Sequence, residues 1–213
     1  MQWLLDSDVI WKLATFDLLN ELLGVLVAKK TDLFYLPELH YQLKSRRIWE
    51  KHDHDAIRRV LEFVKGIKRI TMSDPVEQII LHAAKATYQN RPERIDGGEQ
   101  LLFMATKTLQ LSIISTHDKK SLRTLANDST CKAIHQRVKG RVMCLEQIVV
   151  RMIDKYGYKH IQEKIGPLCA IDEVMLHSFA NGKTDHSEAE CLKWLRDYIQ
   201  RLNAETSNVL VVP

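Results

Sequence analysis

Acidic residues follow apolar runs at separate places in the sequence. Asp6, with Ser7 and Asp8 directly after it, ends the apolar run "QWLL", and Asp118 follows the apolar run "LSIIST". Glu99 opens the helical stretch that leads into that second run. Carboxylates from several positions suit a hard cation such as Mg²⁺ or Mn²⁺. Such a cation orients a water molecule and neutralises the charge that builds up on a phosphodiester.

Each of these acids also has a purely structural interpretation. Asp6 and Asp118 stand where a helix N-cap is expected, and Asp is a favoured N-cap residue. Glu99 lies in the first turn of a helix, where an acid interacts favourably with the helix dipole. The chemical interpretation therefore depends on whether the fold brings the three side chains to one place.

The elements around these acids follow an alternating pattern. Apolar runs of strand length are separated by segments with helical periodicity, which predicts an α/β fold with a parallel sheet covered on both faces. In such a sheet, ligands bind outside the carboxyl ends of the strands. Asp74-Pro75 predicts the start of a helix over 74–88. Strands are predicted at 2–6, 32–37, 67–72, 111–116 and 141–146.

The pattern changes after residue 146. Segments of helical periodicity separated by glycines predict an all-helical C-terminal extension over 147–213. Within its last helical segment, we expect Trp194, Leu195 and Tyr198 to be packing residues.

Composition and charge narrow the class of protein. The chain has 213 residues and a net charge of +4, and the Lys and Arg excess lies in the first 145 residues. This charge is compatible with a polyanionic substrate. Four widely spaced cysteines form no metal or redox motif. We expect no secretory signal, because the first residues contain acids and lack a basic start followed by an apolar core. No apolar run of the sequence reaches membrane-spanning length. We therefore expect a cytoplasmic protein with no membrane partner.

Four stretches, taken in order, resemble a PIN-like nuclease domain over residues 1–146. They are "LLDSDVI", "LFYLPELHYQL", "DGGEQLLFMA" and "IISTHDKKSLRTL". The resemblance implies a PIN-like parallel sheet flanked by helices and a metal-dependent nuclease. Residues 147–213 form a separate helical extension in this interpretation.

The resemblance also implies roles for particular residues. Asp6, Glu99 and Asp118 would be the catalytic acids that bind Mg²⁺ or Mn²⁺, with Ser7 supporting Asp6 and Asp8 lying close by. The family's further acid falls on Gln42, which offers a neutral oxygen and no charge. Glu38, one helical turn earlier, is the candidate that compensates for this departure.

Basic residues beside the predicted site suggest where a nucleic acid would lie. Lys119, Lys120 and Arg123 follow Asp118 and are candidates for phosphate contacts. The competing interpretation is a solvated helix face.

Two functions from different classes remain open. The first is an endoribonuclease acting on RNA, with DNA as another possible substrate. Bacterial relatives of this kind act as toxins of toxin–antitoxin pairs or in defence, which implies an antitoxin or other regulatory protein, or a homodimer, as a partner. The second is a catalytically weak PIN-like module that binds a protein or nucleic acid in an assembly.

Overall fold

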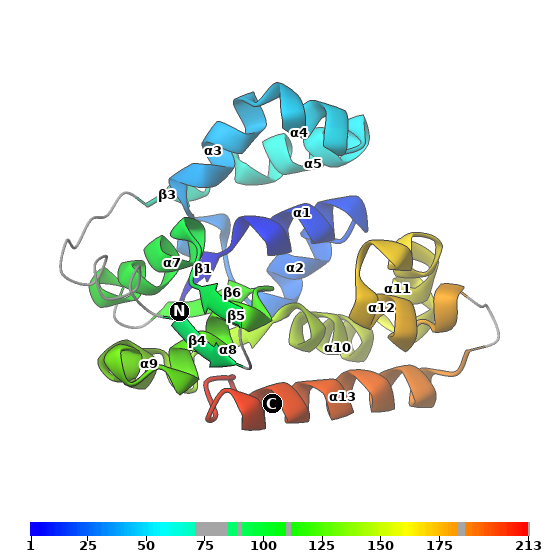
Figure 1. Ribbon diagram of the computed structural model, residues 1–213. Coiled ribbons are helices and arrows are strands. Elements are labelled where there is room, and N and C mark those ends of the chain that lie inside the picture. Colours follow the sequence, from blue (N-terminus) through cyan, green and yellow to red (C-terminus); the bar gives the residue numbers. More distant parts are fainter. Residues whose placement is uncertain (71–84, 89–90, 110–111, 183–185, 213) are drawn as a thin grey trace.

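A five-stranded sheet forms the centre of the molecule (Figure 1). The computed structural model describes residues 1–70, 85–88, 91–109, 112–182 and 186–212. Every pairing in this sheet is parallel, and the strand order is β3-β2-β1-β6-β7. The predicted parallel α/β fold is therefore confirmed. The strands are β1 (Gln2–Leu5), β2 (Leu33–Tyr35), β3 (Lys68–Arg69), β6 (Ser112–Thr116) and β7 (Val142–Cys144).

Helices cover both faces of this sheet. Side chains along a strand point alternately to opposite faces, so Trp3 and Leu5 join one hydrophobic cluster and Leu4 joins the other. The first cluster includes residues of α1 (Ser7–Thr15), α2 (Leu19–Leu26), α5 (His54–Val64) and α10 (Leu145–Tyr156). The second cluster includes residues of α7 (Gly97–Thr108), α8 (Lys119–Asn127) and α9 (Lys132–Val138). Strands β1, β2 and β7 are largely apolar because both of their faces are buried, whereas β3 consists of the exposed residues Lys68 and Arg69.

Local signals explain where several helices begin. Asp6 caps α1, and Pro37 is the first residue of α3 (Pro37–Lys44), where its missing N–H costs nothing. Asp118 caps α8 by accepting hydrogen bonds from two backbone N–H groups. Between α3 and α5 lies the short helix α4 (Arg46–Lys51). The capping interpretation of the acids is thus confirmed for Asp6 and Asp118.

The helix predicted over 74–88 is wrong at its C-terminal end. Lys85–Tyr88 form strand β4, which pairs antiparallel with β5 (Arg91–Arg94). The prediction rested on helical periodicity, which does not include pairing with another strand. Pairing with β5 gives the backbone of β4 hydrogen bonds that a helix would otherwise provide. The remainder of the predicted helix, 74–84, lies outside the described residues.

The C-terminal part contains the predicted helices and packs into the same cores as the rest. Ile161 and Leu195 belong to the first cluster, and Leu202 and Leu210 belong to the second. Leu210 also bridges to Val142 at the edge of the sheet, in parallel orientation. No helix among the described residues is long and apolar enough to cross a membrane. The elements after α10 are α11 (Tyr158–Ile165), the 3-10 helix η3 (Gly166–Ile171), α12 (Glu173–Ser178), the 3-10 helix η4 (Ala180–Gly182) and α13 (Glu188–Glu205).

Candidate active site

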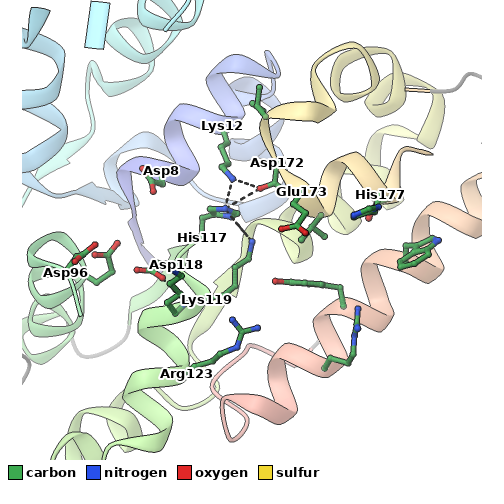
Figure 2. A pocket seen from close by; sticks show the side chains of 18 residues that line it. Asp8, Lys12, Asp96, His117, Asp118, Lys119, Arg123, Asp172, Glu173 and His177 are labelled. Carbon is green, nitrogen blue, oxygen red and sulfur yellow. Dashed lines mark hydrogen bonds and ion pairs between the residues drawn. The ribbon is translucent and has the colours of Figure 1, made fainter. Parts of the chain in front are cut away.

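A cleft of about 670 Å³ lies at the carboxyl edge of the sheet. The chain leads from β1 to β2 and β3 on one side and places β6 and β7 on the other, so the strand order reverses between β1 and β6. That reversal is where open α/β sheets bind ligands. Side chains from α1, α7 and α8 line the cleft, and η3, α12 and α13 supply others. In Figure 2, Asp8, Asp96 and Asp118 lie on one side, and Glu173 and His177 on the other.

Asp6, directly after β1, accepts hydrogen bonds from its two sequence neighbours and from Thr116 at the end of β6. It is 6% exposed, and its Oδ2 accepts a hydrogen bond from Thr116 Oγ1 at 3.0 Å. Its Oδ1 accepts from Ser7 Oγ and from the Asp8 N–H, both at 3.4 Å. Burial, followed by the nearby Asp8 carboxylate, raises the pKa of Asp6 to about 6. The Ser7 hydroxyl and the Asp8 N–H therefore both contact Asp6, and the roles that the resemblance implies for these residues stay predictions.

Thr116 links the carboxyl ends of the neighbouring strands β1 and β6. Its hydroxyl donates to Asp6 and accepts from the Asp118 N–H at 3.1 Å. The Asp118 carboxylate accepts from the Ser121 hydroxyl at 2.7 Å and from the Lys120 N–H at 2.8 Å. Both of its oxygens thus have partners in the first turn of α8.

Glu99 couples electrostatically to both of these acids. Burial raises its pKa to about 8, with further contributions from the Asp6, Asp118 and Asp96 carboxylates. Thr116 joins Asp6 to Asp118, and Asp96, Glu99 and Asp118 line the same cleft, so the acids that follow β1 and β6 converge with those at the start of α7. We call Asp6, Asp96, Glu99 and Asp118 the acidic cluster.

The acidic cluster has the oxygen ligands that a hard cation site needs, but its side chains are not arranged around a common point. Carboxylate oxygens are the ligands that Mg²⁺ and Mn²⁺ prefer. Within the described part of the chain, however, no three His, Cys, Asp or Glu side chains are arranged to hold a metal ion. Binding an ion would require at least one carboxylate of the cluster to reorient.

The two residues considered for the family's further acid are placed differently from each other. Gln42 Oε1 accepts a hydrogen bond from Trp11 Nε1 at 2.8 Å, so this oxygen is already engaged. Glu38 lies in the first turn of α3, after the carboxyl end of β2. Its Oε2 is buried and makes no hydrogen bond to any described residue. Glu38 is thus the one with an unused oxygen.

The three basic candidates have different environments. Lys119 forms an ion pair with Glu146, at 2.9 Å, and Arg123 forms one with Glu205, at 2.8 Å. Lys120 is exposed on the first turn of α8. All three line the cleft, and Lys120 is the most accessible of them.

A chain of compensated charges lies beside the acidic cluster. Lys12 Nζ contacts both Asp172 Oδ2 and His117 Nε2, and His117 Nε2 lies 3.3 Å from Asp172 Oδ2 (Figure 2). Lys119 Nζ lies 3.0 Å from His117 Nδ1. We call Lys12, His117, Lys119, Glu146 and Asp172 the ion-pair network.

The electrostatics of this network indicate a neutral histidine. Burial, followed by the Lys119 and Lys12 ammonium groups, lowers the pKa of His117. A neutral imidazole has one acceptor nitrogen, so His117 accepts either from Lys12 at Nε2 or from Lys119 at Nδ1, but not from both at once. Burial alone would raise the pKa of Asp172, but the hydrogen bond and charge of Lys12 outweigh it, so that this pKa is lowered.

Comparisons with known proteins add no relative. No family model, no curated protein and no solved structure matches the chain. The resemblance to PIN-like nucleases therefore stays a prediction from sequence motifs.

Sequence reasoning missed the part of the cleft that the C-terminal helices build. Trp194 was expected to pack, but it is 52% exposed and lines the cleft. Tyr198 also lines the cleft, and it packs against the second hydrophobic cluster as expected. Leu195, its neighbour, is buried as expected. Asp172 was also missed, although it caps α12 through the Met175 N–H. The position of Asp172 directly before a helical segment could have predicted the helix cap, but not the ion pair with Lys12.

Proposed function

We propose that this protein is a divalent-metal-dependent endoribonuclease that hydrolyses phosphodiester bonds in the cleft at the carboxyl ends of β1 and β6. The observation that carries the proposal is the placement of the acids: Thr116 joins Asp6 to Asp118, and Glu99 and Asp118 line the same cleft. Burial, followed by the Asp6 and Asp118 carboxylates, raises the pKa of Glu99 to about 8. Acids brought together against their own repulsion are typical of functional sites. A divalent cation would remove that repulsion.

In this proposal Asp6, Glu99 and Asp118 hold Mg²⁺ or Mn²⁺. The ion, when bound, lowers the pKa of a water molecule and stabilises charge on the phosphodiester. Residues of the chain position the acids and the phosphate. Thr116 keeps Asp6 and Asp118 in register, and Lys120 offers an exposed ammonium group to a phosphate.

A second candidate is a catalytically weak module that binds RNA or protein in an assembly. Specific observations favour it. The oxygens of Asp6 and Asp118 already accept hydrogen bonds, and Gln42 is engaged by Trp11. The described residues also contain no three-ligand group arranged for a metal ion.

An assay on labelled single-stranded RNA with Mn²⁺ separates the two candidates, with single-stranded DNA in parallel. We expect Asp6→Asn to reduce the cleavage rate on the order of a hundredfold or more, because it removes a ligand charge. Asn is as good an N-cap as Asp, so α1 should keep its start. The matched control is Asp55→Asn on α5, an exposed acid remote in sequence from the cluster.

Thermal melting provides a second readout. Mn²⁺ should raise the melting temperature of the wild type and of Asp55→Asn but not of Asp6→Asn, because a ligand stabilises the state that binds it. Absence of both cleavage and stabilisation in the wild type would contradict the nuclease proposal and favour the binding module.

A further inference from the structure

Helix α13 presents an ordered stripe of side chains to the cleft. Trp194, Tyr198 and Arg201 all line it, and their spacing of four and three residues places them on one face of the helix. Leu195, one position from Trp194, is fully buried in the first hydrophobic cluster. The helix is therefore anchored by one face and leaves an aromatic face open toward the cleft.

The indole of Trp194 is oriented by a second element. The ring of His177, on α12, stacks on it with a centroid separation of 6.3 Å and an interplanar angle of 23°. His177 also lines the cleft and is exposed (Figure 2). Trp194 and Arg201 additionally line a neighbouring hollow of about 660 Å³, so the indole is reached from both hollows. We call His177, Trp194 and Tyr198 the aromatic wall.

Cations accompany the aromatic wall. The Lys119 ammonium group lies 5.5 Å from the Tyr198 ring centroid, and the Arg201 guanidinium lies 5.9 Å from it. Lys119 is already paired with Glu146, so the exposed Arg201 is the cation of this group that is placed to contact a phosphate. Aromatic rings on which a base can stack, next to a cation that can bind a phosphate, are the combination that binds single-stranded nucleic acid. A duplex hides the faces of its bases, whereas an unpaired nucleotide exposes them.

We propose that the aromatic wall stacks an unpaired base of a single-stranded RNA, with Trp194 as the main platform. This inference deepens the proposed nuclease function and rests on it for the position of the scissile bond. The C-terminal helices then hold the RNA strand across the cleft from the acidic cluster. Because every base has an aromatic face, this contact selects for an unpaired strand and not for a sequence.

Binding measured without cleavage tests the inference. The probe is a fluorescein-labelled single-stranded RNA of about 12 nucleotides, within the range of single-strand binding sites, in buffer with EDTA. We expect Trp194→Ala to weaken binding about tenfold, the loss of roughly one stacked base, and Trp194→Phe to recover much of it. The same RNA annealed to its complement should bind wild type more weakly than the single strand does.

Matched variants separate stacking from folding. Trp49→Ala removes another partly exposed tryptophan, on α4, and should leave binding unchanged. His177→Ala tests the wall from its other element and should weaken binding several-fold. Unchanged binding in Trp194→Ala and His177→Ala, or no measurable binding by wild type, would overturn the inference.

The two proposals fail in different ways. If Asp6→Asn abolishes cleavage and Trp194→Ala leaves RNA binding intact, the nuclease proposal stands and the stacking inference falls. If wild type binds RNA through Trp194 but never cleaves it, the stacking inference stands and the nuclease proposal falls. Equal loss of binding to single-stranded RNA and DNA supports the stacking contact, since stacking does not involve the ribose.

Discussion

The acidic cluster and the ion-pair network adjoin the same cleft but handle charge in opposite ways. In the acidic cluster, Glu99 meets carboxylates of its own sign, and its pKa is raised to about 8. In the ion-pair network, burial alone would lower the pKa of Lys119, but Glu146 outweighs burial and raises it. Among the described residues, no ion pair compensates the acidic cluster, whereas the ion-pair network contains its own counter-charges.

From this difference we infer a structural role for the ion-pair network and, under the proposed function, a ligand-binding role for the acidic cluster. Buried charges that are paired hold elements together, and removing one partner leaves the other uncompensated. Buried charges of like sign cost stability, and they persist where a ligand or a reaction uses them. The comparison predicts that changes in the two regions will move stability in opposite directions.

The largest effect is expected in the ion-pair network. Glu146→Gln removes a fully buried carboxylate and leaves the largely buried Lys119 without its nearest counter-charge. We expect a loss of about 3 kcal/mol in the free energy of unfolding, measured with urea at pH 7. The control Glu50→Gln breaks the exposed pair with Arg46 and should cost less than about 1 kcal/mol. Equal effects of the two variants would contradict the comparison.

A stabilising effect is expected in the acidic cluster. Because the pKa of Glu99 rises from 4.5 to about 8 on folding, the unfolded chain releases this proton first as the pH increases. Wild-type stability therefore falls between pH 4.5 and pH 8, whereas Glu99→Gln does not titrate. In metal-free buffer at pH 8, we expect Glu99→Gln to be more stable by about 1–2 kcal/mol after allowance for solvent screening. The difference should vanish near pH 4.5, and a variant less stable than wild type at pH 8 would refute the repulsion.

The smallest effect on stability is expected for Asp118→Asn. Asn also caps helices, so the free energy of unfolding should change by less than about 1 kcal/mol. The removed charge should lower the pKa of Glu99, because Asp118 contributes to raising it. A ¹³C-detected titration of the Glu99 carboxyl in wild type and variant measures this change. An unchanged pKa would show that the two carboxylates do not interact.

Residues next to strand ends were the most predictable part of the molecule. Asp6 and Asp118 end apolar runs, and parallel strands bring their carboxyl ends to one edge. The strands and the placement of Asp6 and Asp118 at one edge therefore followed from local pattern and one topological rule, whereas a metal site formed by these acids with Glu99 stays a prediction. The β4–β5 hairpin did not, since its pairing depends on a partner strand and not on periodicity.

The opposite side of the cleft was not predictable in this way. Asp172 meets Lys12 across 160 positions of sequence, and helical periodicity does not specify such a contact. Trp194 and Leu195 are adjacent apolar residues, yet one is half exposed and the other is buried. Which of them faces the core depends on how α13 rotates against α10 and α12, and that rotation is a property of the assembled fold.

The contact between Lys12 and Asp172 limits how this protein can diverge. Lys12 lies in the first helix, and Asp172 lies among the C-terminal helices. The buried carboxylate of one part is therefore neutralised by an ammonium group of the other. In a chimera that replaced every residue after 146, Lys12 would lack its counter-charge beside the cleft unless the new segment supplied a carboxylate there. We therefore expect such an exchange to destabilise the fold, because the Lys12 ammonium group would lose its counter-charge.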